Sequence, residues 1–302
     1  MFQEAYHVAV MLDEVIEGLK IIPSGLYVDC TLGGGGHSKA ILNQLDQKGK
    51  LIVFDQDKEA RNNAPEDARV TFVPHNFRHL KRFLRVHKIT KVDGILADLG
   101  VSSHQFDTAD RGFSTRFDSP LDMRMDQRQE LNAAHILKAY PEEKLKRLFE
   151  QYGEVTNAKT LAKTIVEQRS NISLDTVNEF RNAIHGIVKG NPNKYFAQVF
   201  QALRIEVNDE FGALQEMLEQ VPDVLVAGGR IAVITFHSIE DRIVKNFFRS
   251  GSFNEIQTDE VYGTRQSAPF NIITKKPIMA SREEIRMNSR SRSAKLRIAE
   301  KK

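Results

Sequence analysis

Acidic residues stand where two apolar runs of this sequence end. Asp55 closes the run Leu51–Asp55, and Asp98 closes the run Ile95–Asp98. A carboxylate that leaves an apolar strand needs water, a partner or a ligand, because an unpaired buried charge is unfavourable. Asp55 also follows a glycine-rich segment by about 20 residues, where a carboxylate can accept hydrogen bonds from both ribose hydroxyls of a nucleotide. Both acids are therefore candidate ligand-binding residues.

The glycine-rich segment is Gly33–Gly36, followed by His37. Glycine adopts positive φ angles and lets the backbone approach a ligand closely, at the sheet edge where doubly wound folds bind nucleotides. A dinucleotide fingerprint would need a further glycine at position 38 or 39, and Ser38 and Lys39 stand there. We therefore expect a nucleoside-type cofactor and disfavour an NAD-dependent dehydrogenase.

The sequence lacks the residues that several other kinds of chemistry require. Cys30 is the single cysteine, so no intrachain disulfide or thiolate cluster forms, and we expect it to be a small core residue in a reducing compartment. No tight His/Cys spacing predicts a metal site. No Gly-x-Ser-x-Gly nucleophile elbow supports a hydrolase.

Alternating strand and helix patterns predict an α/β fold with a doubly wound, Rossmann-like sheet. Helix-like stretches without strands then fill 105–205, so we expect an inserted helical domain there and a cofactor-binding domain made of 1–104 and 206–302. The predicted strands are Leu26–Cys30, Leu51–Asp55, Val70–Val73, Ile95–Asp98 and Arg230–Phe236, with a helix at Ser38–Leu45.

The last hundred residues carry further local predictions. A helix is expected around Asn208–Leu225, followed by a turn at Gly228 and Gly229. Ser238, with Asp241 three residues later, resembles a capping box that opens another helix. The apolar/basic alternation of Ala294–Ala299 predicts a half-buried strand.

Positive charge is concentrated at the C-terminus. Residues 275–302 hold ten Lys/Arg and three Asp/Glu, a net charge of +7 within a chain whose total is +3. Such a segment either contacts nucleic acid or forms a solvated face. No run approaches the length of a membrane helix, and the N-terminus lacks the layout of a secretory signal, so we expect a cytoplasmic protein.

Several short sequence segments, in their order along the chain, resemble the RsmH (MraW) family of bacterial ribosomal RNA methyltransferases. The resemblance runs through nearly the whole chain. The segments are His7 with Met11–Val15, Gly35–Ser38, Asp98–Ser103, Arg111–Ser114, Pro120–Met125, Phe200–Ile205 with Val207–Asn208, Phe236–Arg242 and Ser289–Arg297.

The resemblance implies a class I S-adenosylmethionine (SAM)-dependent enzyme that methylates the exocyclic N4 of a cytidine. The cytidine would lie in the decoding region of 16S rRNA, within the small (30S) ribosomal subunit, and the helical insert would recognise this substrate. By the same resemblance, the SAM contacts fall on Gly35, Gly36, His37, Asp55, Phe77, Asp98 and Gln105.

Three residues are candidates for the reaction itself. Asp98 could accept a hydrogen bond from the cytosine amine and later its proton, or it could only anchor the cofactor. Enzymes that methylate exocyclic amines often place two prolines after such a residue, whereas Leu99 and Gly100 follow here. Phe236 and His237 could form a wall for an unstacked base, or serve as core and strand-end residues.

Basic residues of the helical insert and of the C-terminal segment could contact RNA phosphates. The alternative is that the arginines of the insert pair with Asp107, Asp110 or Asp122 inside the protein. A non-catalytic RNA-binding module stays a rival hypothesis, which the glycine segment and Asp55 disfavour. The oligomeric state is open, a homodimer included, as is the choice between naked RNA and an assembled subunit. The proposed phosphate contacts are Arg111, Arg124, Arg290, Arg292, Lys295 and Arg297.

Overall fold

The computed structural model describes residues 9–253 and 268–302. The chain forms two compact units, Met1–Gly100 with Gly212–Lys302, and Val101–Phe211. His7, part of the first segment that resembles the family, lies outside the described residues. Among the helices of the described part, none has the length and apolar character needed to cross a membrane.

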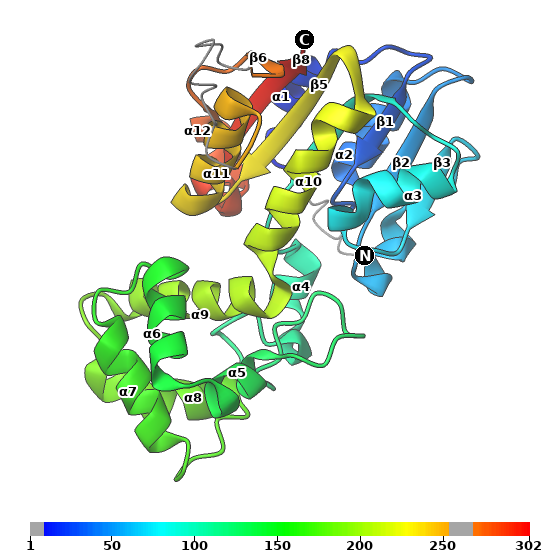
Figure 1. Cartoon of the computed structure of the whole chain (residues 1–302). Coiled ribbons are helices and arrows are strands. Elements are labelled where there is room, and N and C mark those ends of the chain that lie inside the picture. Colours follow the sequence, from blue (N-terminus) through cyan, green and yellow to red (C-terminus); the bar gives the residue numbers. More distant parts are fainter. Residues whose placement is uncertain (1–8, 254–267) are drawn as a thin grey trace. The chain divides into compact units, whose positions relative to one another are not determined.

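The first unit is built on an eight-stranded sheet of order β3-β2-β1-β4-β5-β8-β6, with β7 paired to β8 (Figure 1). The first five strands are parallel, and the other three pair antiparallel. Strand order reverses between β1 and β4, which is where doubly wound folds bind ligands. The strands are β1 Leu26–Asp29, β2 Lys50–Phe54, β3 Val70–Val73, β4 Val92–Asp98, β5 Leu225–Thr235, β6 Phe270–Ile272, β7 Ile278–Met279 and β8 Lys295–Lys301.

Side chains along each parallel strand alternate between two hydrophobic cores. In β4, Ile95 and Ala97 pack in the core that includes α3, α10 and α11, whereas Leu96 packs in the core that includes α1 and α2. Helices thus cover both faces (Figure 1), and the predicted doubly wound fold is confirmed. The helices of this unit are α1 Leu12–Leu19, α2 Gly36–Gln44, α3 Leu80–Val86, α10 Glu210–Val224, α11 Ser238–Ser250 and α12 Arg282–Met287.

Three local predictions in this unit differ from the structure, two of them only in detail. Gly228 and Gly229 lie inside β5, at an irregularity where the register with β4 shifts, because a positive φ at Gly228 accommodates a bulge as readily as a turn. His237, and not Ser238, is the N-cap of α11, and its side chain accepts a hydrogen bond from the Glu240 N–H. The strand predicted over Ala294–Ala299 is present as β8, but it is buried from Leu296 to Ala299 and not half-buried, because α1 packs on one of its faces and α11 on the other.

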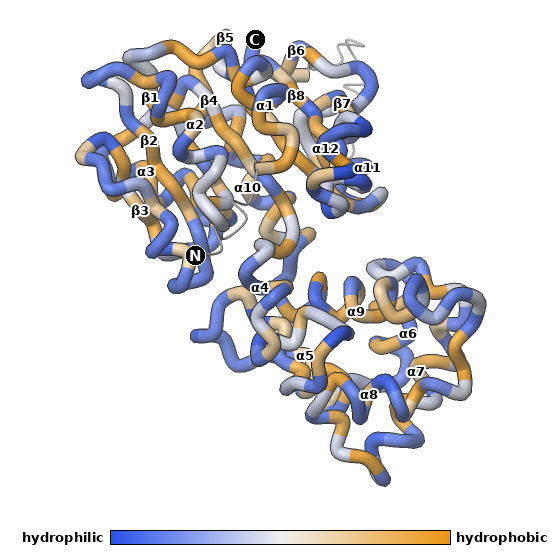
Figure 2. Tube along the Cα trace, turned by 180° about the vertical axis from the view of Figure 1, so that it is seen from behind, coloured by the Kyte–Doolittle hydropathy of each residue, from blue (hydrophilic) through white to orange (hydrophobic). Residues whose placement is uncertain are grey.

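The second unit is helical and has its own hydrophobic core. Figure 2 shows hydrophobic stretches along its helices as well as along the strands of the first unit. The longest helix, α9, buries nine of its residues, and seven of these, among them Phe196, Val199 and Leu203, lie in this core. The helices are α4 Ser103–Asp107, α5 Ala133–Ala139, α6 Glu142–Gln151, α7 Ala158–Gln168, α8 Val177–Ile184 and α9 Pro192–Asn208.

Candidate active site

The loop between β1 and α2 uses glycine conformations that other residues rarely adopt. Gly33 has φ 49° and Gly35 has φ 77°. A Cβ on Gly35 would lie 2.5 Å from the Asn63 carbonyl oxygen, so only glycine fits there. Around Gly34, in contrast, no atom of the described residues lies within 4 Å of the Cβ position. The loop therefore packs tightly on one side and leaves its backbone accessible on the other, as a nucleotide-binding loop requires.

Asp55 follows β2 and is bonded to this loop. Its Oδ2 accepts the Gly33 N–H at 2.9 Å, and its Oδ1 accepts the Asp57 N–H at 2.9 Å. Burial nevertheless raises the pKa of Asp55 to about 6. Each carboxylate oxygen keeps a second lone pair. Asp55 can therefore hold the loop and still accept hydrogen bonds from ribose hydroxyls.

Asp98 ends β4 with one carboxylate oxygen unused. Its backbone N–H donates to Thr31 Oγ1 at 2.7 Å, and its Oδ2 lies 3.6 Å from His37 Nδ1. Its Oδ1 is buried without a hydrogen-bond partner among residues 9–253 and 268–302. Burial raises the pKa of Asp98 to about 6, against the opposing effect of His37. Since buried polar atoms are normally paired, this oxygen is suited to receive a ligand.

His37 connects Asp98 to the segment before α1. Its Nε2 lies 2.9 Å from the Val10 carbonyl oxygen, which can only accept a hydrogen bond, so we place a proton on Nε2. In the neutral ring, Nδ1 is then an acceptor facing Asp98. One proton placed between His37 Nδ1 and Asp98 Oδ2 would give both atoms a hydrogen-bond partner.

Asp29, at the end of β1, is an acid to which the sequence analysis gave no role. It is fully buried, and it accepts hydrogen bonds from Ser38 Oγ at 2.6 Å and the Thr31 N–H at 3.0 Å. Burial raises the pKa of Asp29. An acid directly before a glycine-rich loop was the sequence signal for it.

Three acids thus end neighbouring strands of one sheet edge, Asp29 on β1, Asp55 after β2 and Asp98 on β4. A negative edge of this kind favours a cationic ligand. SAM carries a positive sulfonium and an ammonium group as well as a ribose. The open backbone at Gly34 and the unpaired Asp98 Oδ1 therefore fit this cofactor.

The end of β5 brings Phe236 and His237 to the same edge. Asp98 lies opposite Ile234 in the sheet, and Leu99 donates its N–H to the Ile234 carbonyl at 3.0 Å. Gly100 has φ 100°, and a Cβ there would lie 3.5 Å from Phe236 Cδ2. Both aromatic residues are partly buried. Their proposed contact with a base stays a prediction.

Phe77 starts the short 3₁₀ turn Phe77–His79 beyond β3, and it packs against the core shared with α3. The ring of His75, two residues earlier, stacks on Phe83 at 4.4 Å between centroids. Phe77 therefore has a packing role, and its proposed stacking on adenine stays a prediction.

Gln105 lies in the helical unit, where it completes a capping box of α4. Its N–H donates to Ser102 Oγ, and its Oε1 accepts the Ser102 N–H at 3.1 Å. Its side chain is buried. The implied SAM contact of Gln105 stays a prediction.

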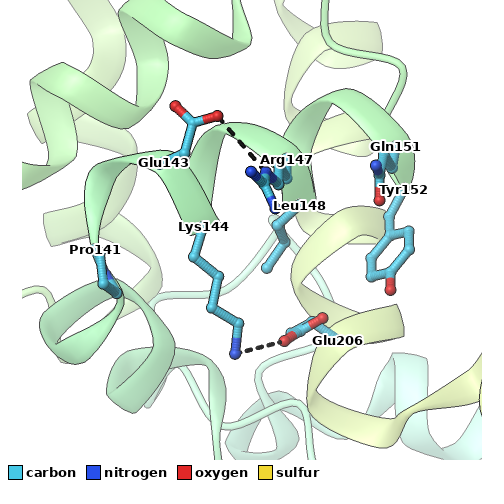
Figure 3. Close-up of a pocket in the computed structure, with 8 residues that line it drawn as sticks. All are labelled: Pro141, Glu143, Lys144, Arg147, Leu148, Gln151, Tyr152 and Glu206. Carbon is cyan, nitrogen blue, oxygen red and sulfur yellow. Dashed lines mark ion pairs between the residues drawn. The ribbon is translucent and has the colours of Figure 1, made fainter.

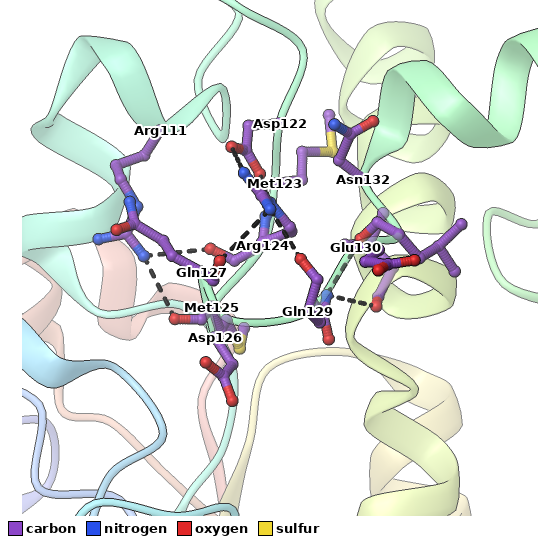
Figure 4. A network of polar contacts seen from close by, with 12 residues as sticks. Arg111, Asp122, Met123, Arg124, Met125, Asp126, Gln127, Gln129, Glu130 and Asn132 are labelled. Atoms are coloured by element: carbon purple, nitrogen blue, oxygen red, sulfur yellow. Dashed lines mark hydrogen bonds and ion pairs between the residues drawn. The ribbon is translucent and has the colours of Figure 1, made fainter.

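The two arginines assigned to RNA in the helical unit are bonded inside the protein (Figure 4). Arg111 is buried, and its Nη2 donates to the carbonyl oxygens of Arg124 and Met125 at 3.1 and 3.3 Å. Arg124 pairs with Asp122 at 2.7 Å and also donates to the Gln129 carbonyl. Arg124 therefore corresponds to the alternative of pairing with Asp122, whereas Arg111 is bonded to loop carbonyls; the RNA contacts of both arginines stay predictions.

The C-terminal basic residues differ among themselves. Arg292 is exposed and Arg290 is partly buried in the 3₁₀ turn Ser289–Ser293. Lys295 Nζ lies 3.9 Å from Asp241. Arg297 is buried and forms an ion pair with Asp241 at 2.6 Å, which locks α11 to β8. Arg297 therefore has a structural partner in place of a phosphate.

The helical unit also contains a cavity of about 520 Å³ that the sequence did not predict. Figure 3 shows that acidic and basic side chains alternate around it, with Lys144 paired to Glu206 and Arg147 to Glu143. These pairs neutralise one another, so the cavity shows no preference for a charged ligand. Its lining residues are Pro141, Glu143, Lys144, Arg147, Leu148, Gln151, Tyr152 and Glu206.

Known proteins that are similar to this chain identify its family. The model of the MraW methylase family matches residues 4–302. Proteins named ribosomal RNA small subunit methyltransferase H from Flavobacterium johnsoniae and Porphyromonas gingivalis are each 52% identical, over 98% and 99% of this chain and 98% of their own length. The structure of Aeropyrum pernix fibrillarin with bound SAM aligns with 9% identity and a TM-score of 0.41, over 99% of this chain and 84% of that one. The predicted family, methyltransferase activity and SAM cofactor are confirmed: the chain belongs to the MraW methylase family of SAM-dependent methyltransferases.

Proposed function

We propose that this enzyme methylates the exocyclic N4 of a cytidine in the decoding region of 16S rRNA, within the small ribosomal subunit. The relatives named ribosomal RNA small subunit methyltransferase H support the rRNA substrate. The observation that carries the choice of an amine is Oδ1 of Asp98, which is buried at the ligand-binding edge of the sheet without a hydrogen-bond partner in the described part of the chain.

Different residues of this sheet edge bind different parts of the cofactor. The backbone of Gly34 and Gly35 receives the cofactor closely, Asp55 accepts its ribose hydroxyls, and the acids of β1 and β4 face its positive charge. When bound, SAM supplies an electrophilic methyl group on a sulfonium. Holding the acceptor nitrogen in line with that methyl group contributes much of the rate.

Asp98 acts on the acceptor amine. The N4 lone pair of cytosine is delocalised into the ring, and a hydrogen bond from N4–H to a carboxylate localises electron density on the nitrogen. With a pKa of about 6, Asp98 is mostly ionised at neutral pH, yet basic enough to take the proton that methylation releases. The unpaired Oδ1 is the atom to which we assign this bond.

RNA recognition is assigned to two regions. The helical unit, predicted over 105–205, recognises the shape of the substrate, and Arg290, Arg292 and Lys295 contact phosphates. The target base must leave its stack to reach Asp98, with Phe236 and His237 as the wall beside it. A substrate of this kind is assembled in the cytoplasm, in agreement with the predicted location.

Methylation of undermodified small ribosomal subunits tests the proposal. The purified protein is incubated with methyl-labelled SAM, and the label is mapped to a nucleotide and an atom. We expect the label on N4 of one decoding-region cytidine. Label on another atom or RNA, or none despite measured SAM binding, would reject this substrate; parallel reactions with naked 16S rRNA show whether the assembled subunit is required.

A further inference from the structure

Glu240 is a buried carboxylate in the first turn of α11. It is the third residue of this helix and is only 2% exposed. Glutamate at this position often bonds back to the backbone that precedes a helix. Glutamate is nevertheless almost never fully buried unless it is paired, so its partners reveal what the carboxylate is for.

Those partners are the two residues at the end of β5. Glu240 Oε2 accepts the Phe236 N–H at 3.0 Å, and Oε1 lies 3.1 Å from His237 Nε2. His237 Nδ1 in turn accepts the Glu240 N–H at 3.5 Å, as the N-cap of the helix. Because Nδ1 acts as an acceptor, the proton of the neutral ring is on Nε2, which faces the carboxylate. Glu240 thus fixes a backbone segment by a hydrogen bond, and its negative charge faces the ring nitrogen that carries the proton.

Glu240 also lies near the reacting edge of the sheet. Its negative charge contributes to raising the pKa of Asp98. Asp98 itself lies opposite Ile234 in the sheet, two residues before Phe236. The carboxylate therefore connects the Phe236–His237 segment electrostatically with the residue that we assign to the acceptor amine.

We infer that Glu240 is a positioning residue, which holds Phe236 and His237 as a rigid wall for the acceptor base. It acts through these two residues. The inference rests on the proposed function, since the base is the cytosine proposed above. A loose wall would displace the base from the methyl group without affecting the glycine loop or Asp55, so the loss should appear in kcat and leave the affinity for SAM unchanged.

The first test compares Glu240→Gln with the wild-type enzyme on undermodified small subunits. The amide keeps an oxygen for the Phe236 N–H but loses the charge that faces His237. We expect kcat to fall about 10- to 100-fold, the size of effect that a small misplacement of reacting groups produces, with the Kd for SAM within about twofold. Glu300→Gln is the matched control, because Glu300 pairs with Arg230 at 3.0 Å, away from the ligand-binding end of β5; we expect wild-type kcat.

The pH profile separates positioning from simple support of the fold. The charged groups that influence Asp98 are His37, which lowers its pKa, and Asp29 and Glu240, which raise it. Removing the charge of Glu240 lowers the pKa of Asp98, so the acidic limb of kcat/KM should move to lower pH. A variant that only weakens the fold would leave that limb in place.

A readout independent of RNA keeps the inference separate from the proposed function. NMR of ¹⁵N-labelled histidine reports the His237 tautomer, and His237→Asn, which retains a capping side chain, identifies the signal. We expect Nε2–H in the wild type and a mixture of tautomers in Glu240→Gln. His237→Asn should also lose kcat at an unchanged melting temperature, which covers the case that Glu240→Gln fails to fold.

The outcomes are distinct. If the wild-type enzyme labels no cytidine N4, the proposed function fails, while the histidine spectra still show whether Glu240 fixes the ring. If the wild-type enzyme is active and Glu240→Gln keeps its kcat, its acidic limb and its His237 tautomer, the inference is overturned.

Discussion

Two polar regions of this molecule both contain segments that resemble the family, but their hydrogen bonding is opposite. Around the loop that contains Arg111 and Arg124, guanidinium groups donate to carbonyl oxygens and to Asp122, all within the helical unit. At the sheet edge, Asp98 keeps a buried oxygen without a partner in the described part of the chain. The arginines of the loop are thus satisfied by neighbouring groups, whereas Asp98 retains hydrogen-bonding capacity that a ligand can use.

The largest effect is expected from replacing Asp98, which we propose as hydrogen-bond acceptor for the amine. Asp98→Asn keeps the shape of the side chain but offers the amine no charged acceptor, so we expect methyl transfer to slow by about 10²- to 10⁴-fold, the range for a general base. Single-turnover rates at saturating SAM on undermodified subunits measure this. A retained rate combined with weaker SAM binding would show that Asp98 only anchors the cofactor.

Asn208→Ala tests the opposite region, where bonds are internal. The Asn208 side chain accepts the Met125 N–H at 2.7 Å and donates to the Met123 and Arg204 carbonyls at 2.8 and 2.9 Å. Losing this partner of buried backbone groups should lower the free energy of unfolding by about 3 kcal/mol, measured by chemical denaturation. Asn193→Ala, at an exposed position of the same helix, should change it by less than about 0.5 kcal/mol. An Asn208→Ala variant of unchanged stability would contradict a structural role for this network.

The sheet edge was largely predictable because a regular pattern of strands determines where strand-end residues lie. Asp55, Asp98 and the glycine loop follow apolar runs, and parallel strands bring their carboxyl ends together. The contacts of Glu240 and Arg297 depend on how α11 packs against β5 and β8, and no local pattern encodes that packing. Arg297 looked like part of a basic, solvent-facing alternation, yet β8 lies between two neighbouring strands and its arginine is buried against Asp241.

The helical unit was predictable in type and less so in its side-chain roles. Helix-like periodicity predicted helices between residues 105 and 205, and α5 to α9 lie there. Arg111 and Arg124 were ambiguous because a basic residue in a segment that resembles the family fits a phosphate contact and an internal ion pair equally well. Only the position of Asp122 and of the loop carbonyls in space decides between these roles.

Asp55→Asn tests how one carboxylate serves both a loop and a ligand. Its oxygens hold the Gly33 and Asp57 N–H groups, and hydrogen bonds to a charged group contribute about 1.5–3 kcal/mol. We expect the Kd for SAM to rise about 10- to 30-fold by calorimetry, with the rate at saturating SAM within about threefold. An unchanged Kd would mean that Asp55 is a loop residue only, and would move it to the structural side of the comparison.

The smallest effect concerns stability without cofactor. The folded-state pKa of Asp98 is about 6, above its ordinary value of 3.8, so its contribution to stability is fully present below about pH 4 and is lost as pH rises through 6. Asp98→Asn removes the charge that must otherwise be buried. At pH 7.5 we expect this variant to be more stable than the wild type by about 1–2 kcal/mol in thermal or chemical unfolding, a figure reduced for the partial exposure of the side chain.

That gain should disappear at pH 4, where the wild-type carboxyl is protonated, and shrink when SAM is added to the wild-type protein. Asp122→Asn provides the contrast, since Asp122 is paired with Arg124 and its loss should destabilise the helical unit at pH 7.5. A gain for Asp98→Asn that is equal at pH 4 and pH 7.5 would show that repacking, and not the buried charge, separates the two variants. At pH 7.5 we therefore expect Asp98→Asn to raise the free energy of unfolding and Asp122→Asn to lower it. The first carboxylate is buried for a ligand, whereas the second is part of an internal network.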